Sequence, residues 1–122
     1  MNDTTSNTYQ FINLEYLDLM SDGDNGMKKI LLEMLLDELP TEFEKMIACS
    51  DSKSWNDLSE VSHKMKSTLA YVGNDEMTVS NKTIEILSKT EQDLDQIPTL
   101  LASLKTNLDR VMPELKIELS RL

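Results

Sequence analysis

The chain of 122 residues has few of the residues that build metal sites, disulfides and tight turns, with one cysteine, one histidine, three glycines and three prolines. A single cysteine excludes an intramolecular disulfide. Because the chain also has only one histidine, a site that needs several Cys or His ligands is nearly excluded as well. No apolar run reaches the length that crosses a membrane, because the longest one, 30–39, contains Glu33, Asp37 and Glu38.

Negative charge dominates, with 22 acidic residues against 12 basic ones and a net charge of −10. Such a surplus repels phosphate backbones and anionic lipids, so we expect neither nucleic acid nor a membrane surface as a partner. Residues 1–10 are polar and lack the basic and apolar regions of a signal peptide. We therefore expect a cytoplasmic protein, with a disordered tail over 1–10 and one domain over 11–122.

The scarcity of glycine and proline, and the absence of strand-like alternation, predict long helices. Apolar residues recur at three- and four-residue steps, as they do on the buried side of a helix. We expect a short helix with Asn13 as its N-cap over 13–20, and long helices over 27–47, over 55–72, from 74 or 75 onward, and over 97–122. Pro40 should kink or split the first long helix. The pattern predicts an all-α fold, an antiparallel four-helix bundle with a short extra N-terminal helix.

The apolar stripe of the last helix alternates steps of four and three, as in a dimerising coiled coil. We favour packing within the chain, because the other long helices need a partner for their own stripes. The expected oligomeric state is a monomer.

The lone histidine, His63, lies on the predicted helix 55–72. At about 100° per residue it is roughly 160° from the middle of that helix's apolar stripe, so it faces solvent. Its neighbours at steps of three and four are Ser59, Lys66, Ser67 and Ala70. Three of these are small and leave the ring accessible, while Lys66 can place an ammonium near an anion on the ring. A neutral, exposed imidazole with a nearby cation favours a phosphoryl acceptor over an unused surface histidine.

The run from His63 to Gly73, HKMKSTLAYVG, resembles the signature of histidine-containing phosphotransfer (HPt) domains. That signature has a His, a Lys three residues later, two small or hydroxyl residues, and a Gly ten residues after the His. Here His63, Lys66, Ser67, Thr68 and Gly73 occupy those positions, although many members have Gly in place of Ser67. The resemblance extends over about 11–122, because the family is built as a four-helix bundle.

The resemblance implies a phosphocarrier rather than an enzyme, one that neither binds ATP nor phosphorylates itself. Its partners would be the receiver domains of response regulators and of a hybrid histidine kinase. No cofactor is expected in this chain, and no metal, because the Mg²⁺ of the reaction would sit in the receiver. His63 would accept the phosphoryl group and Lys66 would offset its charge. Gly73 would end the helix, and partner docking would fall on Ser59, Lys64, Ser67 and Ala70.

Other interpretations stay open. The phosphoacceptor domain of a histidine kinase is also helical, but it usually has an acidic residue directly after the His, where this chain has Lys64. A metal-binding bundle is disfavoured, because the chain lacks the inward Glu and the inward Glu-x-x-His pairs of di-iron proteins, and its single histidine is predicted to face solvent. A non-catalytic helical adaptor with an incidental His63 is the main alternative.

Overall fold

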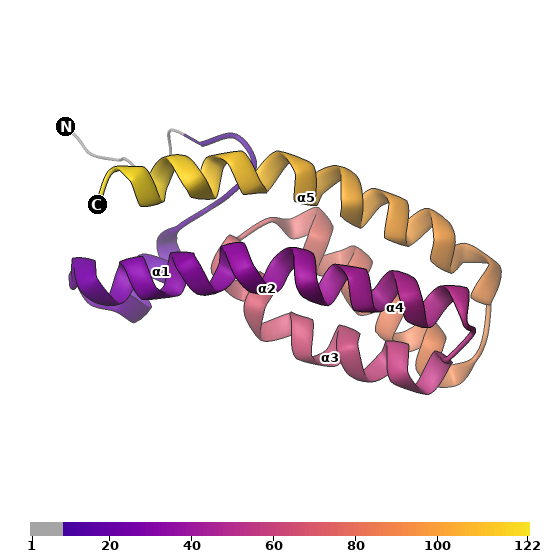
Figure 1. Cartoon of the computed structure of the whole chain (residues 1–122). Coiled ribbons are helices and arrows are strands. Elements are labelled where there is room, and N and C mark those ends of the chain that lie inside the picture. The colour runs from indigo at the N-terminus through magenta and orange to yellow at the C-terminus, as the bar shows by residue number, and fades with distance from the viewer. Residues whose placement is uncertain (1–8) are drawn as a thin grey trace.

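The computed structural model describes residues 9–122 as helices joined by short connections, without a strand in that range (Figure 1). The elements are α1 (Glu15–Ser21), α2 (Asn25–Asp51), α3 (Trp55–Val72), α4 (Asp75–Thr90), the 3₁₀ turn η2 (Leu94–Gln96) and α5 (Ile97–Ser120). The all-helical prediction is confirmed. Most of the expected tail, residues 1–8, lies outside the described residues.

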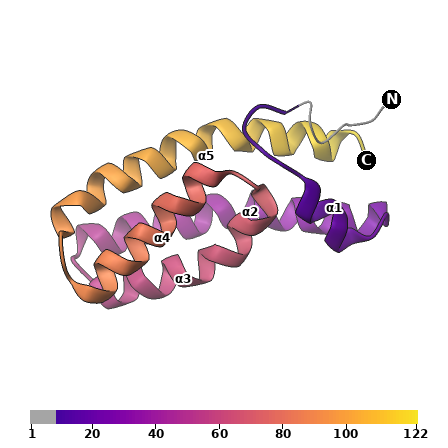
Figure 2. The same cartoon turned by 180° about the vertical axis from the view of Figure 1, so that it is seen from behind.

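Each of the four long helices packs against two others. α3 lies between α2 and α4, and α5 contacts both α4 and α2. In Figures 1 and 2 these helices run side by side, and the chain reverses its direction at each connection between them. The short α1 packs on α2 and α3. α3 therefore has a helix on either side, and one face left for solvent.

The core is mostly leucine, and on α2 it does not include every apolar residue of the predicted helix 27–47. Leu32, Leu35 and Leu39 are fully buried. Met27 and Ile30, two apolar residues at the start of that predicted helix, are 44% and 60% exposed. The buried row of α2 keeps steps of three and four through Leu32, and a helix can present only one such row to its neighbours.

Pro40 does not split the first long helix. α2 continues without a break from Asn25 to Asp51 with Pro40 inside it. A proline in a helix interior removes one hydrogen bond and costs about 3 kcal/mol. Leu39 and Phe43, on either side of it, are both buried in the core. Their burial offsets that cost, so the helix persists through the proline.

The N-terminal segment is held against α5. The Tyr9 hydroxyl donates to Glu118 Oε1 at 2.7 Å. The Glu114 carboxylate accepts the backbone N–H groups of residues 10–12 at 2.9 to 3.1 Å. Two residues of the expected tail, Tyr9 and Gln10, therefore belong to the packed part of the chain.

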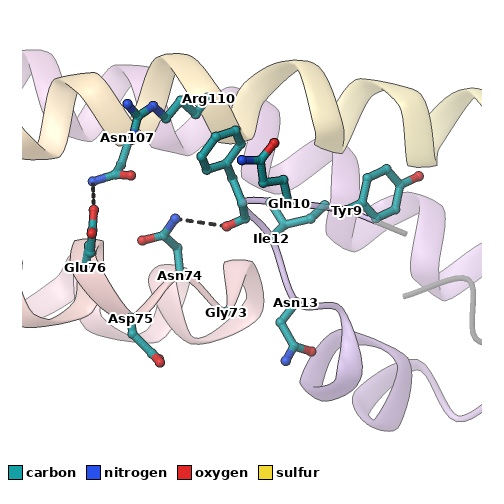
Figure 3. A pocket seen from close by; sticks show the side chains of 11 residues that line it. Tyr9, Gln10, Ile12, Asn13, Gly73, Asn74, Asp75, Glu76, Asn107 and Arg110 are labelled. Carbon is teal, nitrogen blue, oxygen red and sulfur yellow. Dashed lines mark hydrogen bonds between the residues drawn. The ribbon is translucent and has the colours of Figure 1, made fainter. Parts of the chain in front are cut away.

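The same segment crosses the end of α3 at Gly73. Gly73 follows the last residue of α3 with φ at +70°, in the left-handed region. The Asn13 N–H donates to the Val72 carbonyl at 2.9 Å, and Figure 3 shows Asn13 close to Gly73. A Cβ on Gly73 would lie 2.8 Å from the Cβ of Asn13 and closer still to its carbonyl oxygen. The position therefore needs glycine both for its backbone conformation and for this close approach.

The N-cap of α1 lies one residue later than predicted. The helix begins at Glu15, and Leu14 occupies the N-cap position without a side-chain bond. Asn13, the expected cap, lies one residue before Leu14, and its Oδ1 accepts the Glu15 N–H at 2.9 Å.

Across the described part of the chain, no helix combines the length and the apolar character needed to span a membrane.

Candidate functional site

The site is built on the solvent face of α3. Leu58, Met65 and Leu69 are buried on the inner side of this helix. His63 projects from the opposite side, and 67% of its side chain is exposed. The direction expected from the helix phase is therefore the direction that the structure shows.

One nitrogen of the imidazole is held by a residue of the neighbouring helix. Nδ1 of His63 lies 2.7 Å from Oε2 of Glu85, whose side chain on α4 is only 15% exposed. Burial raises the pKa of Glu85, but hydrogen bonds from His63 and Lys66 outweigh it, so the pKa lies below its ordinary value. Glu85 is therefore ionised at neutral pH.

This bond fixes the tautomer of the ring. A carboxylate can only accept hydrogen bonds, so the neutral imidazole carries its proton on Nδ1. Within residues 9–122 the ring forms no second hydrogen bond, so Nε2 presents its lone pair outward. The carboxylate of Glu85 thus orients the ring with its nucleophilic nitrogen toward solvent.

Lys66 completes a group of three side chains. Its Nζ lies 3.4 Å from Oε1 of Glu85, and 44% of the side chain is exposed. Glu85 therefore bridges His63 and Lys66, with one oxygen for each. The lysine stands one helical turn after the histidine, close to the place where an anion on the ring would sit.

A buried polar pair sets the register that places Glu85. The hydroxyl of Ser62 lies 2.7 Å from the carbonyl oxygen of Asn81 and 2.8 Å from its Oδ1. Asn81 Nδ2 donates to the Ser62 carbonyl at 2.9 Å, and both residues are fully buried. Ser62 directly precedes His63, and Glu85 lies one turn after Asn81. This pair therefore aligns the two helices so that Glu85 reaches the imidazole.

Sequence reasoning missed Glu85. It lies 22 positions from His63 and on another helix, so no local spacing links the two residues. The one available signal in the sequence was Asn81, a polar residue that lies in the buried row of α4, one turn before Glu85.

Of the four residues expected to dock a partner, Lys64, Ser67 and Ala70 are exposed. The Ser67 hydroxyl donates to the Lys64 carbonyl at 3.1 Å. Ser59 is only 8% exposed and borders the hollow between α3 and α4. Most of its surface is therefore not available to a partner, which corrects the expectation from the helix phase.

The two sides of the exposed face differ in charge. On the α4 side, a hollow of about 460 Å³ is bordered by His63, Lys64 and Lys89 together with Glu60 and Glu85. On the α2 side, the surroundings are more acidic. A second hollow of about 340 Å³ there is bordered by Lys64 and, from α2, by Asp37, Glu38 and Glu42.

A third hollow lies apart from His63, where the N-terminal segment meets the connection between α3 and α4. Its volume is about 500 Å³, and Figure 3 shows Asn74, Glu76 and Asn107 around it. Asn107 donates to Glu76 at 3.0 Å, and Asn74 donates to the Phe11 carbonyl at 2.9 Å. The first bond joins α5 to α4, and the second ties the connection between α3 and α4 to the N-terminal segment; neither involves a residue of the His63 site. Residues 9–122 contain no cluster of three His, Cys, Asp or Glu side chains that could hold a metal ion.

An exposed imidazole held by a carboxylate thus lies on the surface of an all-helical protein. The family model of the Hpt domain matches residues 30–114, more than half of the chain, so the chain belongs to the Hpt domain family. Hpt domains are helical bundles that serve in phosphotransfer within His–Asp phosphorelays, with receiver domains as partners and without kinase activity of their own. No curated protein and no solved structure gives a significant match to the chain. The resemblance expected from the sequence is confirmed, and His63 lies inside the matched region.

Proposed function

We propose that this chain accepts a phosphoryl group on Nε2 of His63 from the aspartyl phosphate of one receiver domain and passes it to the aspartate of another. The observation that carries the proposal is the hydrogen bond from His63 Nδ1 to Glu85, which leaves Nε2 free on a side chain that is 67% exposed. The ring is thereby oriented and accessible at once.

The transfer step balances without a further reactant. The lone pair of Nε2 attacks phosphorus, an N–P bond forms, and the P–O bond to the receiver's aspartate breaks with release of its carboxylate. The ring keeps its proton on Nδ1 and gains positive charge as the bond forms. The return step to a second receiver reverses this sequence. Such a transition state needs in-line positioning and charge stabilisation more than covalent help from the protein.

Glu85 and Lys66 carry opposite charges and have different parts in the proposed transfer. The Glu85 carboxylate faces Nδ1 and stabilises the positive charge that develops on the imidazole, as the aspartate does in a Ser-His-Asp triad. Lys66, held 3.4 Å from Glu85 before the reaction, has an exposed side chain that can turn toward the phosphoryl oxygens. We assign Lys66 to charge stabilisation and Glu85 to positioning.

The docking surface of the proposal contains Lys64, Ser67 and Ala70, which are exposed around His63. The short side chains of Ser67 and Ala70 allow a partner to approach the ring. Mg²⁺ would be supplied by the receiver. The proposal takes the protein as a cytoplasmic monomer that neither binds ATP nor phosphorylates itself. It takes the long helices as an antiparallel four-helix bundle, which the packing of α3 between α2 and α4 supports.

The experiment is a two-step transfer with radiolabelled phosphate. A receiver domain is phosphorylated, incubated with the chain and Mg²⁺, and then chased with a second, unlabelled receiver. We expect a label on the chain that is labile in acid and stable in base, as a phosphoramidate is, and that moves on during the chase. The His63→Gln variant should take up no label. Labelling that persists in this variant would refute the assignment, and binding without any transfer would favour the adaptor.

A further inference from the structure

The outer face of α4 carries an exposed row of apolar and basic side chains. Val79 and Ile86 are 64% and 49% exposed, and Lys82 and Lys89 are exposed as well. Steps of three, four and three residues place all four within a sector of about 80° on the helix. We call these four residues the α4 row.

The α4 row begins at the edge of the His63 site. Lys89 and His63 border the same hollow between α3 and α4. Glu85, which holds the imidazole, lies about 40° around the helix from Lys89 and one turn before it. A partner that contacts His63 therefore also lies over this edge of α4.

Exposed lysines lie on this side of a chain whose net charge is −10, interspersed with the exposed acids Asp57, Glu60, Asp75 and Glu76. Four of the 12 basic residues, Lys64, Lys66, Lys82 and Lys89, lie on the exposed faces of α3 and α4. Of these, Lys64, Lys82 and Lys89 form no ion pair within residues 9–122. The α2 side of α3 is instead flanked by the acidic Asp37, Glu38 and Glu42. The exposed surface around His63 is thus mixed in charge toward α4, where Lys64 and Lys89 lie beside Glu60 and Glu85, and predominantly acidic toward α2.

We propose that the α4 row is part of the docking surface and favours receiver domains that carry acidic side chains and an apolar patch beside their phosphorylated aspartate. This inference rests on the proposed function. A typical interface of about 800 Å² per partner has a radius of roughly 16 Å, and adjacent helix axes lie about 8–10 Å apart, so an interface centred on His63 covers α4. The pocket that binds Mg²⁺ makes a receiver negative near its aspartate, and an acidic partner is repelled on the α2 side. Lys82 and Lys89 would attract it, and Val79 and Ile86 would be buried against it.

The test measures the second-order rate constant of transfer from a receiver domain phosphorylated with acetyl phosphate, at low and high ionic strength. The first variant is Lys82→Ala with Lys89→Ala. Its matched control is Lys105→Ala with Lys116→Ala, two lysines of α5, a helix that packs on α4 and α2 rather than on α3. Both double variants remove two positive charges from the chain. We expect about a tenfold loss at low salt for the α4 variant, with the loss shrinking at high salt, and a change within about twofold for the α5 control.

A further variant separates contact from charge. Ile86→Ser should slow transfer at every ionic strength, because it removes apolar area without changing charge. Equal rates for the α4 and α5 double variants would overturn this inference while leaving the phosphocarrier function standing. If the wild-type chain took up no label at all, both the proposed function and this inference would fall. Circular dichroism of each variant checks that the helices are intact.

Discussion

Replacing Gly73 with alanine tests whether the N-terminal segment is held against the end of α3. The structure gives this substitution two separate costs. Gly73 has φ at +70°, where an L-residue is disfavoured by about 1 kcal/mol or somewhat more. The new Cβ would also clash with the carbonyl oxygen of Asn13 and lie 2.8 Å from its Cβ, so the backbone of the segment must move.

That movement breaks the hydrogen bond from the Asn13 N–H to the Val72 carbonyl, which is 2.9 Å long. A typical intramolecular hydrogen bond contributes about 1 kcal/mol. Together with the cost of a positive φ for alanine, the loss of this hydrogen bond should lower the free energy of unfolding of the Gly73→Ala variant by about 2 to 3 kcal/mol.

Gly23 provides the control, because it has φ at +77° but no atom within 4 Å of where a Cβ would lie. Gly23→Ala should therefore show only the backbone cost of about 1 kcal/mol. The entropy that alanine removes from the unfolded chain is common to both variants and cancels in the comparison.

Urea unfolding, followed by the fluorescence of the single tryptophan, Trp55, gives both free energies. Equal losses for Gly73→Ala and Gly23→Ala would show that the segment does not approach Gly73 as described. Phosphotransfer by folded Gly73→Ala protein should match the wild type, because Gly73 lies about 15 Å along the helix from His63.

Three further substitutions test the site and the N-terminal contact. Glu85→Gln keeps the side-chain shape but removes the charge that orients His63. Transfer should slow about tenfold, the kinetic equivalent of roughly 1.4 kcal/mol, and an unchanged rate in the transfer assay would show that Glu85 is a bystander. Lys66→Ala should slow the transfer with the far-UV circular dichroism unchanged, and wild-type kinetics would remove Lys66 from the mechanism. Burial and the hydrogen bond to Glu118 raise the pKa of Tyr9 to about 12. The stabilisation from this hydroxyl is thus complete below about pH 10 and lost as the pH rises through about 12. Tyr9→Phe should remove the tyrosinate absorbance step near pH 12. A wild-type protein without that step contradicts the contact.

The features that repeat along a single helix could be predicted from the sequence. The bounds of α3, at Trp55 and Val72, follow from its apolar period and from the glycine after it. The exposure of His63 follows from the same period, because one helix can bury only one side. Both predictions rest on residues within a few turns of each other.

The features that depend on how two elements meet could not be predicted. Glu85 reaches His63 only because Ser62 and Asn81 fix the register of α3 against α4. The binding of the N-terminal segment by Glu114 joins residues more than 100 positions apart. No period in the sequence reports such contacts, because each depends on the packed arrangement of the helices.

The measurement that tests the account most directly is ¹⁵N NMR of the imidazole before and after phosphorylation. The chain has one histidine, so the ring signals belong to His63 alone. Before the reaction at neutral pH, the neutral ring should carry its proton on Nδ1, as the bond to Glu85 requires. Afterwards phosphorus should be bonded to Nε2, with Nδ1 still protonated. A neutral ring protonated on Nε2, phosphorus on Nδ1, or phosphate on any other residue would contradict the account.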